Sequence, residues 1–128
     1  MKREIKFRAW DKKKKEMWYV PDIYSVGHLK FKKSTDDLIW LQFTGLKDKN
    51  GKGRWSKEIY EGDIIEDEKG ERFEIMYQKE WGAFIADQGE LGELFFLAKD
   101  KTWANNDKLL IKNIKVIGNI WENPELFI

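Results

Sequence analysis

The chain has no cysteine and a single histidine among its 128 residues. Without cysteine it cannot form a disulfide framework, a thiolate metal site or a cysteine nucleophile. A catalytic triad needs histidine beside a nucleophile and an acid, and transition-metal sites usually combine several His or Cys ligands. No nucleophile motif surrounds His28, and neither glycine-rich phosphate-binding motif occurs. We therefore interpret His28 as incidental and expect neither a cofactor nor a transition metal.

Long hydrophobic runs are also missing. No apolar stretch approaches the roughly 18 residues that a membrane-spanning helix needs. The segment after Met1 passes directly into an alternating pattern and shows no apolar leader. We expect a soluble, cytoplasmic protein that makes no contact with membranes.

Aromatic residues, in contrast, make up 15% of the chain, and charged residues reach 37%. Each buried aromatic side chain removes about 150–250 Å² from water, so a few of them can hold together the core of a highly charged chain. Disordered chains are poor in aromatics. The length and composition predict one folded domain over residues 1–128.

Charge is divided unevenly along the chain. Residues 1–57 hold 16 Lys and Arg against 7 Asp and Glu, a net charge of +9, whereas residues 58–128 hold 8 against 16, a net charge of −8. Such a split favours contact between the two halves, within one chain or between subunits packed head to tail. It could also present a basic face to nucleic acid. Interleaved strands that mix the two sets of charges are an equally good interpretation.

Short alternating or apolar segments separated by turn residues recur along the chain and predict strands. The predicted strands cover residues 3–10, 17–20, 29–31, 38–43, 58–60, 64–65, 73–77, 81–86 and 115–121. Segment 94–97 fits a strand or one helical turn, and residues 105–107 could cap a short helix over residues 108–112. This spacing indicates a mainly β fold of small, barrel-like antiparallel sheets with one or two short helices. The charged loop at 47–57 is where a seam between subdomains would fall.

The alternation also predicts which side chains face the core. In the first strand, Arg8 falls on the polar face and is expected to be exposed. In segment 73–77, the side chains of Phe73, Ile75 and Tyr77 share the inward face. The apolar residues 126–128 must be covered either by the chain's own barrel or by a neighbouring subunit.

Three blocks of sequence carry a resemblance to a known family. They are residues 7–11 (FRAWD), residues 43–52 (FTGLKDKNGK) followed by residues 58–65 (EIYEGDII), and residues 116–126 (VIGNIWENPEL). These blocks and their order resemble the YopX family of phage and prophage proteins, almost from end to end of the chain. The resemblance implies a small, mostly β protein of bacteriophage origin in a bacterial host cell, in a family whose biochemical role is not established.

The family's motif positions fall on residues of turn and core type in this chain. That implies determinants of a fold and no reactive constellation. The chain departs from the family by four inserted residues at 53–56, and Trp55 within them is a candidate exposed contact. The motif positions are Trp10, Asp11, Phe43, Thr44, Gly45, Asp48, Tyr60, Glu61, Gly62, Asp63, Gly118, Asn119, Glu122, Asn123 and Pro124.

Basic residues in the N-terminal half are interleaved with aromatic ones. Basic grooves with aromatic platforms hold single-stranded nucleic acids without reading their sequence. Lysines at hairpin tips equally serve solubility and edge protection. The candidate contacts with nucleic acid or a protein partner are Lys12, Lys13, Lys14, Lys15, Trp18 and Trp55.

Carboxylates are densest between residues 58 and 68. A Mg²⁺ ion could use two or three of these oxygens, and paired carboxylates can act as acid and base. Neighbouring residues of a strand point to opposite faces, however, so most of these side chains cannot converge. We interpret the stretch as a solvated acidic edge in which Asp63 has a structural role in a Gly-Asp turn.

Three hypotheses about function remain. The first is a non-catalytic protein-interaction or accessory factor that acts on a host or phage protein and forms homo-oligomers. The alternative is a nucleic-acid-binding accessory protein that uses the basic N-terminal half. The third, which the sequence supports least, is a Mg²⁺-dependent enzyme built on residues 58–68.

Overall fold

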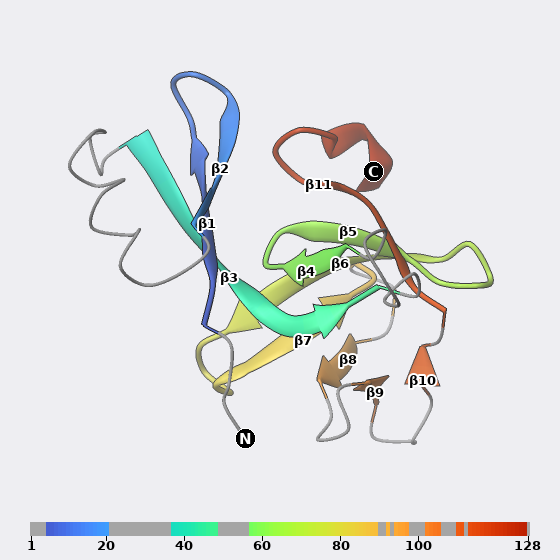
Figure 1. The fold of residues 1–128 in the computed structure, drawn as a ribbon. Helices are drawn as coiled ribbons and strands as arrows, with labels where there is room; N and C mark the ends of the chain where they lie inside the picture. The colour runs from blue at the N-terminus through green and yellow to red at the C-terminus, as the bar shows by residue number, and fades with distance from the viewer. Residues whose placement is uncertain are drawn as a thin grey trace.

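A computed structural model gives the fold of the chain (Figure 1). It describes residues 5–20, 37–48, 57–89, 92, 94–97, 102–105, 110–111 and 113–127. In these residues the strands form two antiparallel sheets, and a short 3₁₀-helix, η2 (Pro124–Phe127), follows the last strand. The mainly β fold predicted from the sequence is therefore confirmed.

The first sheet has four strands in the order β2-β1-β3-β4. Its strands are β1 (Phe7–Asp11), β2 (Glu16–Val20), β3 (Leu38–Lys47) and β4 (Glu58–Tyr60). β1 pairs with both β2 and β3, and the hairpin predicted around the lysine-rich turn is confirmed. β3 runs beyond the predicted 38–43 because a bulge lets its pairing with β4 continue.

That bulge explains the Thr-Gly pair of the second sequence block. Residues 44–46 of β3 stand opposite the single residue Ile59 of β4. Gly45 has a φ of +92°, a conformation that side chains disfavour. The Thr44 hydroxyl donates to the Ile59 carbonyl at 2.7 Å and accepts the Leu46 N–H at 3.1 Å. Because a bulge bends its strand, the end of β3 carries Leu46 into the core of the second sheet.

The second sheet has seven strands in the order β10-β9-β8-β7-β6-β5-β11. Strands β5 to β10 follow one another as a meander, and β11 returns to pair with β5. The chain crosses from the first sheet to the second at residues 61–62. The strands are β5 (Asp63–Glu66), β6 (Arg72–Gln78), β7 (Ala83–Asp87), β8 (Leu94–Leu97), β9 (Trp103–Ala104), β10 (Leu110–Ile111) and β11 (Lys115–Asn119).

This second sheet curls into half of a barrel (Figure 1). Its two edge strands, β10 and β11, are separated by only residues 112–114. An extended residue spans at most about 3.6 Å, so the two edges lie within about 15 Å of each other. The sheet has to bend for its edges to come so close.

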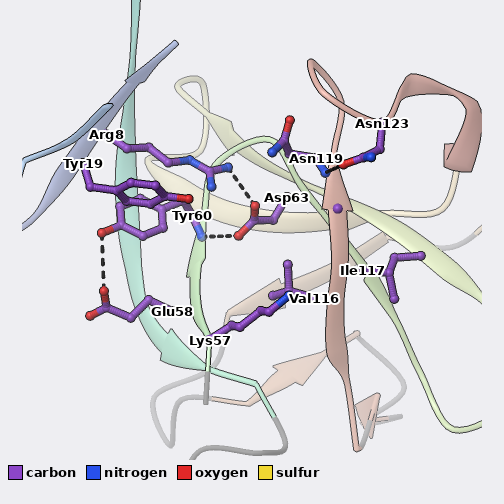
Figure 2. A pocket seen from close by; sticks show the side chains of 11 residues that line it. Arg8, Tyr19, Lys57, Glu58, Tyr60, Asp63, Val116, Ile117, Asn119 and Asn123 are labelled. Atoms are coloured by element: carbon purple, nitrogen blue, oxygen red, sulfur yellow. Dashed lines mark hydrogen bonds and ion pairs between the residues drawn. The ribbon is translucent and has the colours of Figure 1, made fainter. Parts of the chain in front are cut away.

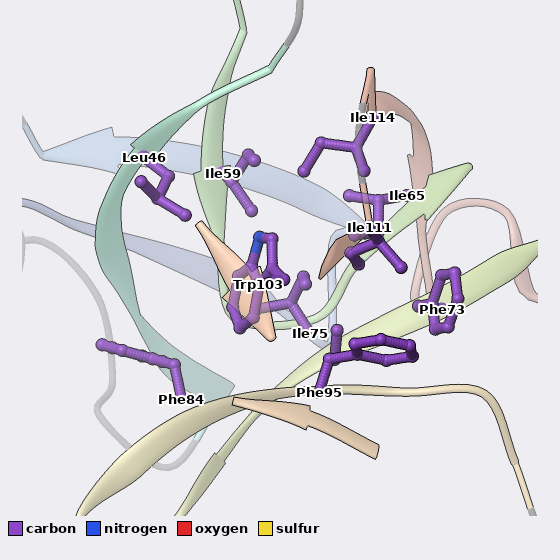
Figure 3. Packing of buried hydrophobic residues seen from close by; sticks show 11 residues of the cluster. Leu46, Ile59, Ile65, Phe73, Ile75, Phe84, Phe95, Trp103, Ile111 and Ile114 are labelled. Atoms are coloured by element: carbon purple, nitrogen blue, oxygen red, sulfur yellow. The ribbon is translucent and has the colours of Figure 1, made fainter. Parts of the chain in front are cut away.

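The main hydrophobic core fills the inside of this curl, and the first sheet closes its open side (Figure 3). Leu46 of β3 and Ile59 of β4 extend into it from the first sheet. Phe73 and Phe95 meet edge to face with ring centroids 5.5 Å apart, an arrangement that aromatic pairs favour. The remaining members are Ile65, Ile75, Phe84, Ala86, Trp103, Ile111 and Ile114.

Several local predictions need correction, and others concern residues outside the described ranges. Tyr77 shares the face of Phe73 and Ile75 but is exposed, because it lies at the end of β6 beyond the covered part of the core. Residues 110–111 form a strand where a helix was predicted, and the ambiguous segment 94–97 is a strand. The predicted strand at 29–31, His28 and loop residues 49–56 lie outside the described residues.

Candidate functional site

A cleft of about 410 Å³ lies between β4 of the first sheet and β11 of the second (Figure 2). Each of these strands is the last of its sheet, so two strand edges border the cleft. Arg8 and Tyr19 of the first hairpin, Lys57 at the start of β4, and residues 116–119 of β11 line its walls. Its size falls in the range of roughly 300–1,000 Å³ in which proteins bind small molecules.

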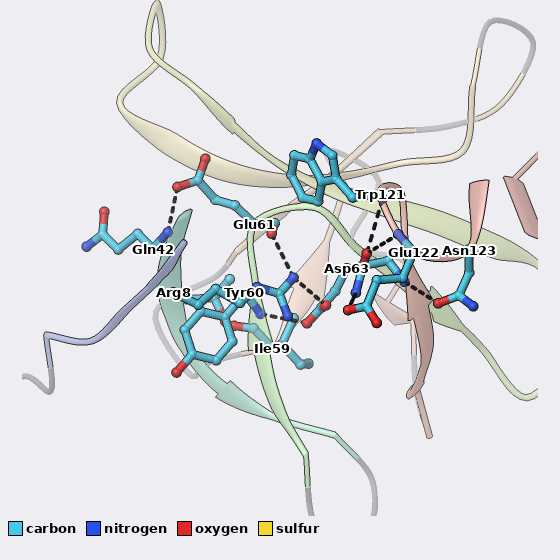
Figure 4. A network of polar contacts seen from close by, with 11 residues as sticks. Arg8, Gln42, Ile59, Tyr60, Glu61, Asp63, Trp121, Glu122 and Asn123 are labelled. Carbon is cyan, nitrogen blue, oxygen red and sulfur yellow. Dashed lines mark hydrogen bonds and ion pairs between the residues drawn. The ribbon is translucent and has the colours of Figure 1, made fainter. Parts of the chain in front are cut away.

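A buried ion pair between β1 and β5 lies at the end of β4 (Figure 4). Arg8 Nη2 is 2.7 Å from Asp63 Oδ1, and the two side chains are only 4% and 2% exposed. The same nitrogen donates to the Glu61 carbonyl at 3.1 Å, and Asp63 Oδ2 accepts the Tyr60 N–H at 2.8 Å. The guanidinium also lies 4.8 Å from the centre of the Tyr60 ring, within cation–π range. The two sheets are thus joined by charge as well as by packing.

The sequence-based placement of Arg8 on an exposed face is therefore wrong. Its partner Asp63 lies 55 residues later in the sequence. Asp63 covers the face of β1 that was predicted to be polar and exposed. Arg8 Nε has no hydrogen-bond partner among the described residues, although it is buried. A buried donor without a partner is uncommon in folded proteins.

Burial governs the ionisation of the groups around this pair. It raises the pKa of Asp63 above its ordinary value, and the charge of Arg8 and the Tyr60 N–H oppose the rise. It also raises the pKa of the Glu61 carboxyl, which accepts the Gln42 N–H at 2.8 Å. Burial, with the nearby Glu58 charge, raises the pKa of the Tyr60 hydroxyl strongly. Tyr60 therefore stays neutral at physiological pH.

Asp48 fixes the spacing of β4 and β11 where the two strands begin. Its Oδ1 accepts the Lys57 N–H at 3.1 Å, and its Oδ2 accepts the Val116 N–H at 3.3 Å. Its own N–H donates to the Lys57 carbonyl at 2.9 Å. A single buried carboxylate thus links the two strand edges at one end of the cleft, and Asp63 lies at the other end.

The acidic and basic halves of the sequence meet within the chain at the cleft. Lys6 Nζ lies 2.5 Å from Glu58 Oε2, and Arg8 pairs with Asp63. Each of these pairs joins a residue of the basic half to one of the acidic half. Lys57, in contrast, makes no ion pair with any residue that the structure describes. Among the described residues, Lys57 is thus the one charged side chain of the cleft lining that has no ion-pair partner.

The rest of the 58–68 carboxylates support local structure. Glu66 lies near Arg72 and Lys115 on the flanking strands. Asp67 accepts two backbone N–H groups of the β5–β6 turn, and Glu68 accepts the Asn113 side-chain amide at 2.7 Å. In the described ranges, no group of three or more His, Cys, Asp and Glu side chains is arranged to hold a metal ion.

The lysine run forms the exposed turn between β1 and β2. Asp11 Oδ1 accepts the backbone N–H groups of Lys13 and Lys14 at 3.0 Å each, so the turn is held by the motif aspartate and leaves the lysine side chains exposed. Trp18 of β2 is 39% exposed, and Trp10 of β1 is buried. Trp55 lies outside the described residues.

Asn119 and Asn123 organise the turn that follows β11 (Figure 2). Asn119 Oδ1 accepts the N–H groups of Trp121 and Glu122 at 3.1 and 2.8 Å. Its side-chain nitrogen donates to Glu122 Oε1 at 3.0 Å, and Asn123 Oδ1 accepts the Asn119 N–H at 3.3 Å. These bonds satisfy the backbone of a tight turn that has no ladder partner.

Two motif glycines leave room for that turn. Gly62 has a φ of +84°, and a Cβ there would overlap the ring of Trp121. A Cβ on Gly118 would lie 2.6 Å from Asn123 Oδ1 and 2.9 Å from Leu126 Cδ1. Leu126 also accepts a hydrogen bond from Arg72 through its carbonyl at 2.9 Å. At this residue, the apolar C-terminal end packs on the chain's own fold.

Several cleft residues were not singled out by the sequence analysis, namely Arg8, Tyr19, Lys57 and Glu58. Arg8 lies inside the first family-like block, which was the available signal. Glu58 lies inside the second family-like block and the acidic stretch, whereas Tyr19 and Lys57 carry no local signal, since their proximity to the cleft depends on how the two sheets meet. In the described part of the chain, no helix has the length and apolar character needed to cross a bilayer.

Comparison with known proteins gives a family and a structural neighbour. A family model described as YopX protein matches residues 6–127. No match is found among curated proteins. The chain is similar to the crystal structure of protein EF1440 from Enterococcus faecalis, with 26% sequence identity and a TM-score of 0.53. That likeness covers 97% of this chain and 98% of the neighbour's, so it extends over both sheets.

Proposed function

Because the chain belongs to the YopX family, we propose that it is a phage- or prophage-encoded, non-catalytic protein-interaction factor. It acts as an accessory protein in the cytoplasm of a bacterial host, on a host or phage protein. The cleft between β4 and β11 is its contact site.

The two facing strand edges at this cleft carry the proposal. Edge strands present backbone groups that can pair with a further strand, and many protein-interaction domains use this mode. Asp48 bonds to the backbone at the start of both strands at one end of the cleft, and Asp63 bonds to the backbone of β4 at the other end. The site is therefore preformed, which lowers the entropic cost of binding.

The ionisable groups of the cleft support a binding role more than a catalytic one. A general acid or base has to reach its substrate and to titrate near the working pH. Asp63 is almost fully buried and bonded through both oxygens, and burial raises the pKa of Tyr60 far above that range. Glu58 is engaged with Lys6.

Site-specific photo-crosslinking tests this proposal. A photoreactive phenylalanine analogue would replace Tyr19, which is 62% exposed at the cleft, and separately Trp81, which is 55% exposed and is not among the cleft residues. In bacteria carrying the phage, we expect position 19 to capture a discrete protein and position 81 not to capture it. Equal capture at both positions, or none at position 19, would refute the contact site.

A nucleic-acid-binding role is the second candidate, and the exposed lysine turn favours it. Lys12 to Lys15 project from the end of a hairpin that also bears the half-exposed Trp18. Fluorescence polarisation with single-stranded DNA and RNA across a salt series tests this role. Binding that weakens log-linearly with salt, and is lost when the four lysines become alanine, would favour it. Replacing the exposed Lys69 and Lys79 provides the control.

We also propose that the protein forms homo-oligomers. Tyr77, near the end of β6, and Trp81, in the β6–β7 turn, are both exposed aromatic residues of the second sheet. The Trp81 ring packs 5.4 Å from that of Phe96. A cluster of this kind is a candidate contact surface for another copy of the chain.

A further inference from the structure

We propose that the cleft between β4 and β11 binds an acidic, extended segment of the partner protein, which lies between the two strand edges as an added strand. This inference rests on the proposed protein-interaction function and names the chemistry of the partner. It depends on the direction of the backbone groups, the charge of the cleft and the nature of its walls.

The backbone N–H and C=O groups of successive β4 residues point alternately toward β3 and away from it. On the β3 side, the Ile59 carbonyl accepts from Thr44 and the Glu61 N–H donates to Gln42. The peptide groups of Glu58 and Tyr60 therefore point to the other side, because successive residues of a strand alternate. The Tyr60 N–H does so, since it bonds to Asp63.

The edge of β11 also borders the cleft, although an irregularity interrupts its pairing with β5 between Val116 and Gly118. Its residues 116–118 line the cleft in succession, and the Val116 N–H points away from β5 to bond with Asp48. At one end of the cleft, the Tyr60 N–H of β4 thus bonds to the Asp63 carboxylate. At the other end, the Val116 N–H of β11 bonds to the Asp48 carboxylate. The same chemistry suits a segment that offers carbonyl and carboxylate oxygens between these two ends.

The charge of the cleft favours an acidic segment. Glu58 and Asp63 are compensated by Lys6 and Arg8, at 2.5 and 2.7 Å. Lys57 remains without an ion-pair partner among the described residues, and Figure 2 shows its side chain extending from the β4 side toward Val116 of β11. The buried Arg8 Nε in the same wall also has no acceptor among them.

The walls suit side chains that alternate along an extended segment. Tyr19 lies at the rim with its ring 5.8 Å from that of Tyr60 in an edge arrangement, and Val116 and Ile117 are half-buried on the opposite wall. A nucleic-acid strand would need a track of cations along its phosphates. With one unpaired cation and two carboxylates in its lining, this cleft fits a peptide better.

The test uses a short blocked peptide of alternating valine and glutamate and a matched peptide of alternating valine and lysine, titrated into the full chain by nuclear magnetic resonance. We expect the glutamate peptide to bind, to shift the amide signal of Glu58 on the β4 edge and to slow the hydrogen exchange of that amide. The lysine peptide should bind more weakly. Lys57→Glu should weaken binding of the glutamate peptide about fivefold to tenfold, whereas Lys69→Glu, at an exposed turn of the second sheet, should leave it unchanged.

Two results would overturn the inference. One is the absence of a shift at Glu58 at about 1 mM glutamate peptide; the other is equal affinity in wild type and Lys57→Glu. Displacement of the peptide by an oligonucleotide would place nucleic acid in the cleft and overturn the inference as well.

Crosslinking separates this inference from the proposed function. If Lys57→Glu captures the partner through position 19 as well as wild type does, the function stands and the acidic segment is wrong; if wild type captures nothing, the function itself fails.

Discussion

Removing one partner of the Arg8–Asp63 ion pair should cost much more stability than removing both. In Arg8→Met, the Asp63 carboxylate stays buried, 2% exposed, without its cation. Breaking a buried pair in this way costs about 3–5 kcal/mol. With a urea m-value of about 2 kcal/mol/M for a small domain, the unfolding midpoint should fall by about 2 M.

The double variant Arg8→Met/Asp63→Asn should recover most of that loss. Neither charge remains buried, and the asparagine oxygen can still accept the Tyr60 N–H that Asp63 Oδ2 binds at 2.8 Å. The remaining cost is chiefly the hydrogen bond from Arg8 to the Glu61 carbonyl, about 1 kcal/mol. A double-mutant cycle should therefore give a coupling energy of at least about 2 kcal/mol.

The Lys6–Glu58 pair provides a matched control on the same two strands. Its side chains are 26% and 28% exposed, so solvent screens the interaction. Lys6→Met and Glu58→Gln should give a coupling of about 0.2–1 kcal/mol. Equal coupling in the two cycles, or additive losses for Arg8 and Asp63, would refute the view that this buried pair joins the sheets.

The same variants should differ in their dependence on pH. Burial already raises the pKa of Asp63 in the folded state, and loss of Arg8 removes a charge that opposes the rise. A carboxyl with a raised folded-state pKa gives stability that is complete below the unfolded value of about 3.9 and is lost as pH rises through the folded value. Arg8→Met should therefore lie closer to wild type at pH 5 than at pH 7. Asp63→Asn should show no such recovery.

Three further changes test other parts of the fold. Gly62→Ala should cost at least about 2 kcal/mol in urea unfolding, because a Cβ there meets the ring of the C-terminal turn, whereas Gly70→Ala, with the same φ of +84° and open space, should cost about 1 kcal/mol. Burial and the facing Asp87 raise the pKa of Glu74, so stability falls as pH rises through that value. Glu74→Gln should therefore stabilise the protein by about 0.5–1 kcal/mol at pH 7, and the gain should vanish below about pH 4. Trp81→Ser, at an exposed turn, should reduce the sedimentation coefficient if the oligomer forms there; an unchanged value would exclude that surface.

Features encoded by a few neighbouring residues could be predicted from the sequence. The lysine turn depends on Asp11, which caps it within three residues. The β5–β6 turn depends on Asp67 and on Gly70, whose positive φ suits glycine. In both places, the alternation of apolar and polar residues also predicted the flanking strands. The mainly β fold follows from such local signals.

The candidate site could not be predicted in the same way. Arg8 bonds to a residue 55 positions away, and Asp48 to one 68 positions away. A period of two tells which side chains share a face of a strand, but it does not tell which face a second sheet will cover. Arg8 and Tyr77 show the two possible errors, a charged residue that is buried and an aromatic residue that is exposed.

The positions of the motif residues separate the frame of this protein from its proposed contact surface. Asp48 and Asp63 hold the strand edges, and Gly62 admits the turn that Asn119 stabilises. Substitutions at these positions should lower the free energy of unfolding and affect binding only through the fold. Lys57 lies outside the motif, is exposed and makes no ion pair with any described residue, so its substitution should cost less stability than a substitution at Asp48 or Asp63. Under the proposed function, a substitution at Lys57 should therefore alter the affinity for the partner while the fold around the cleft is kept.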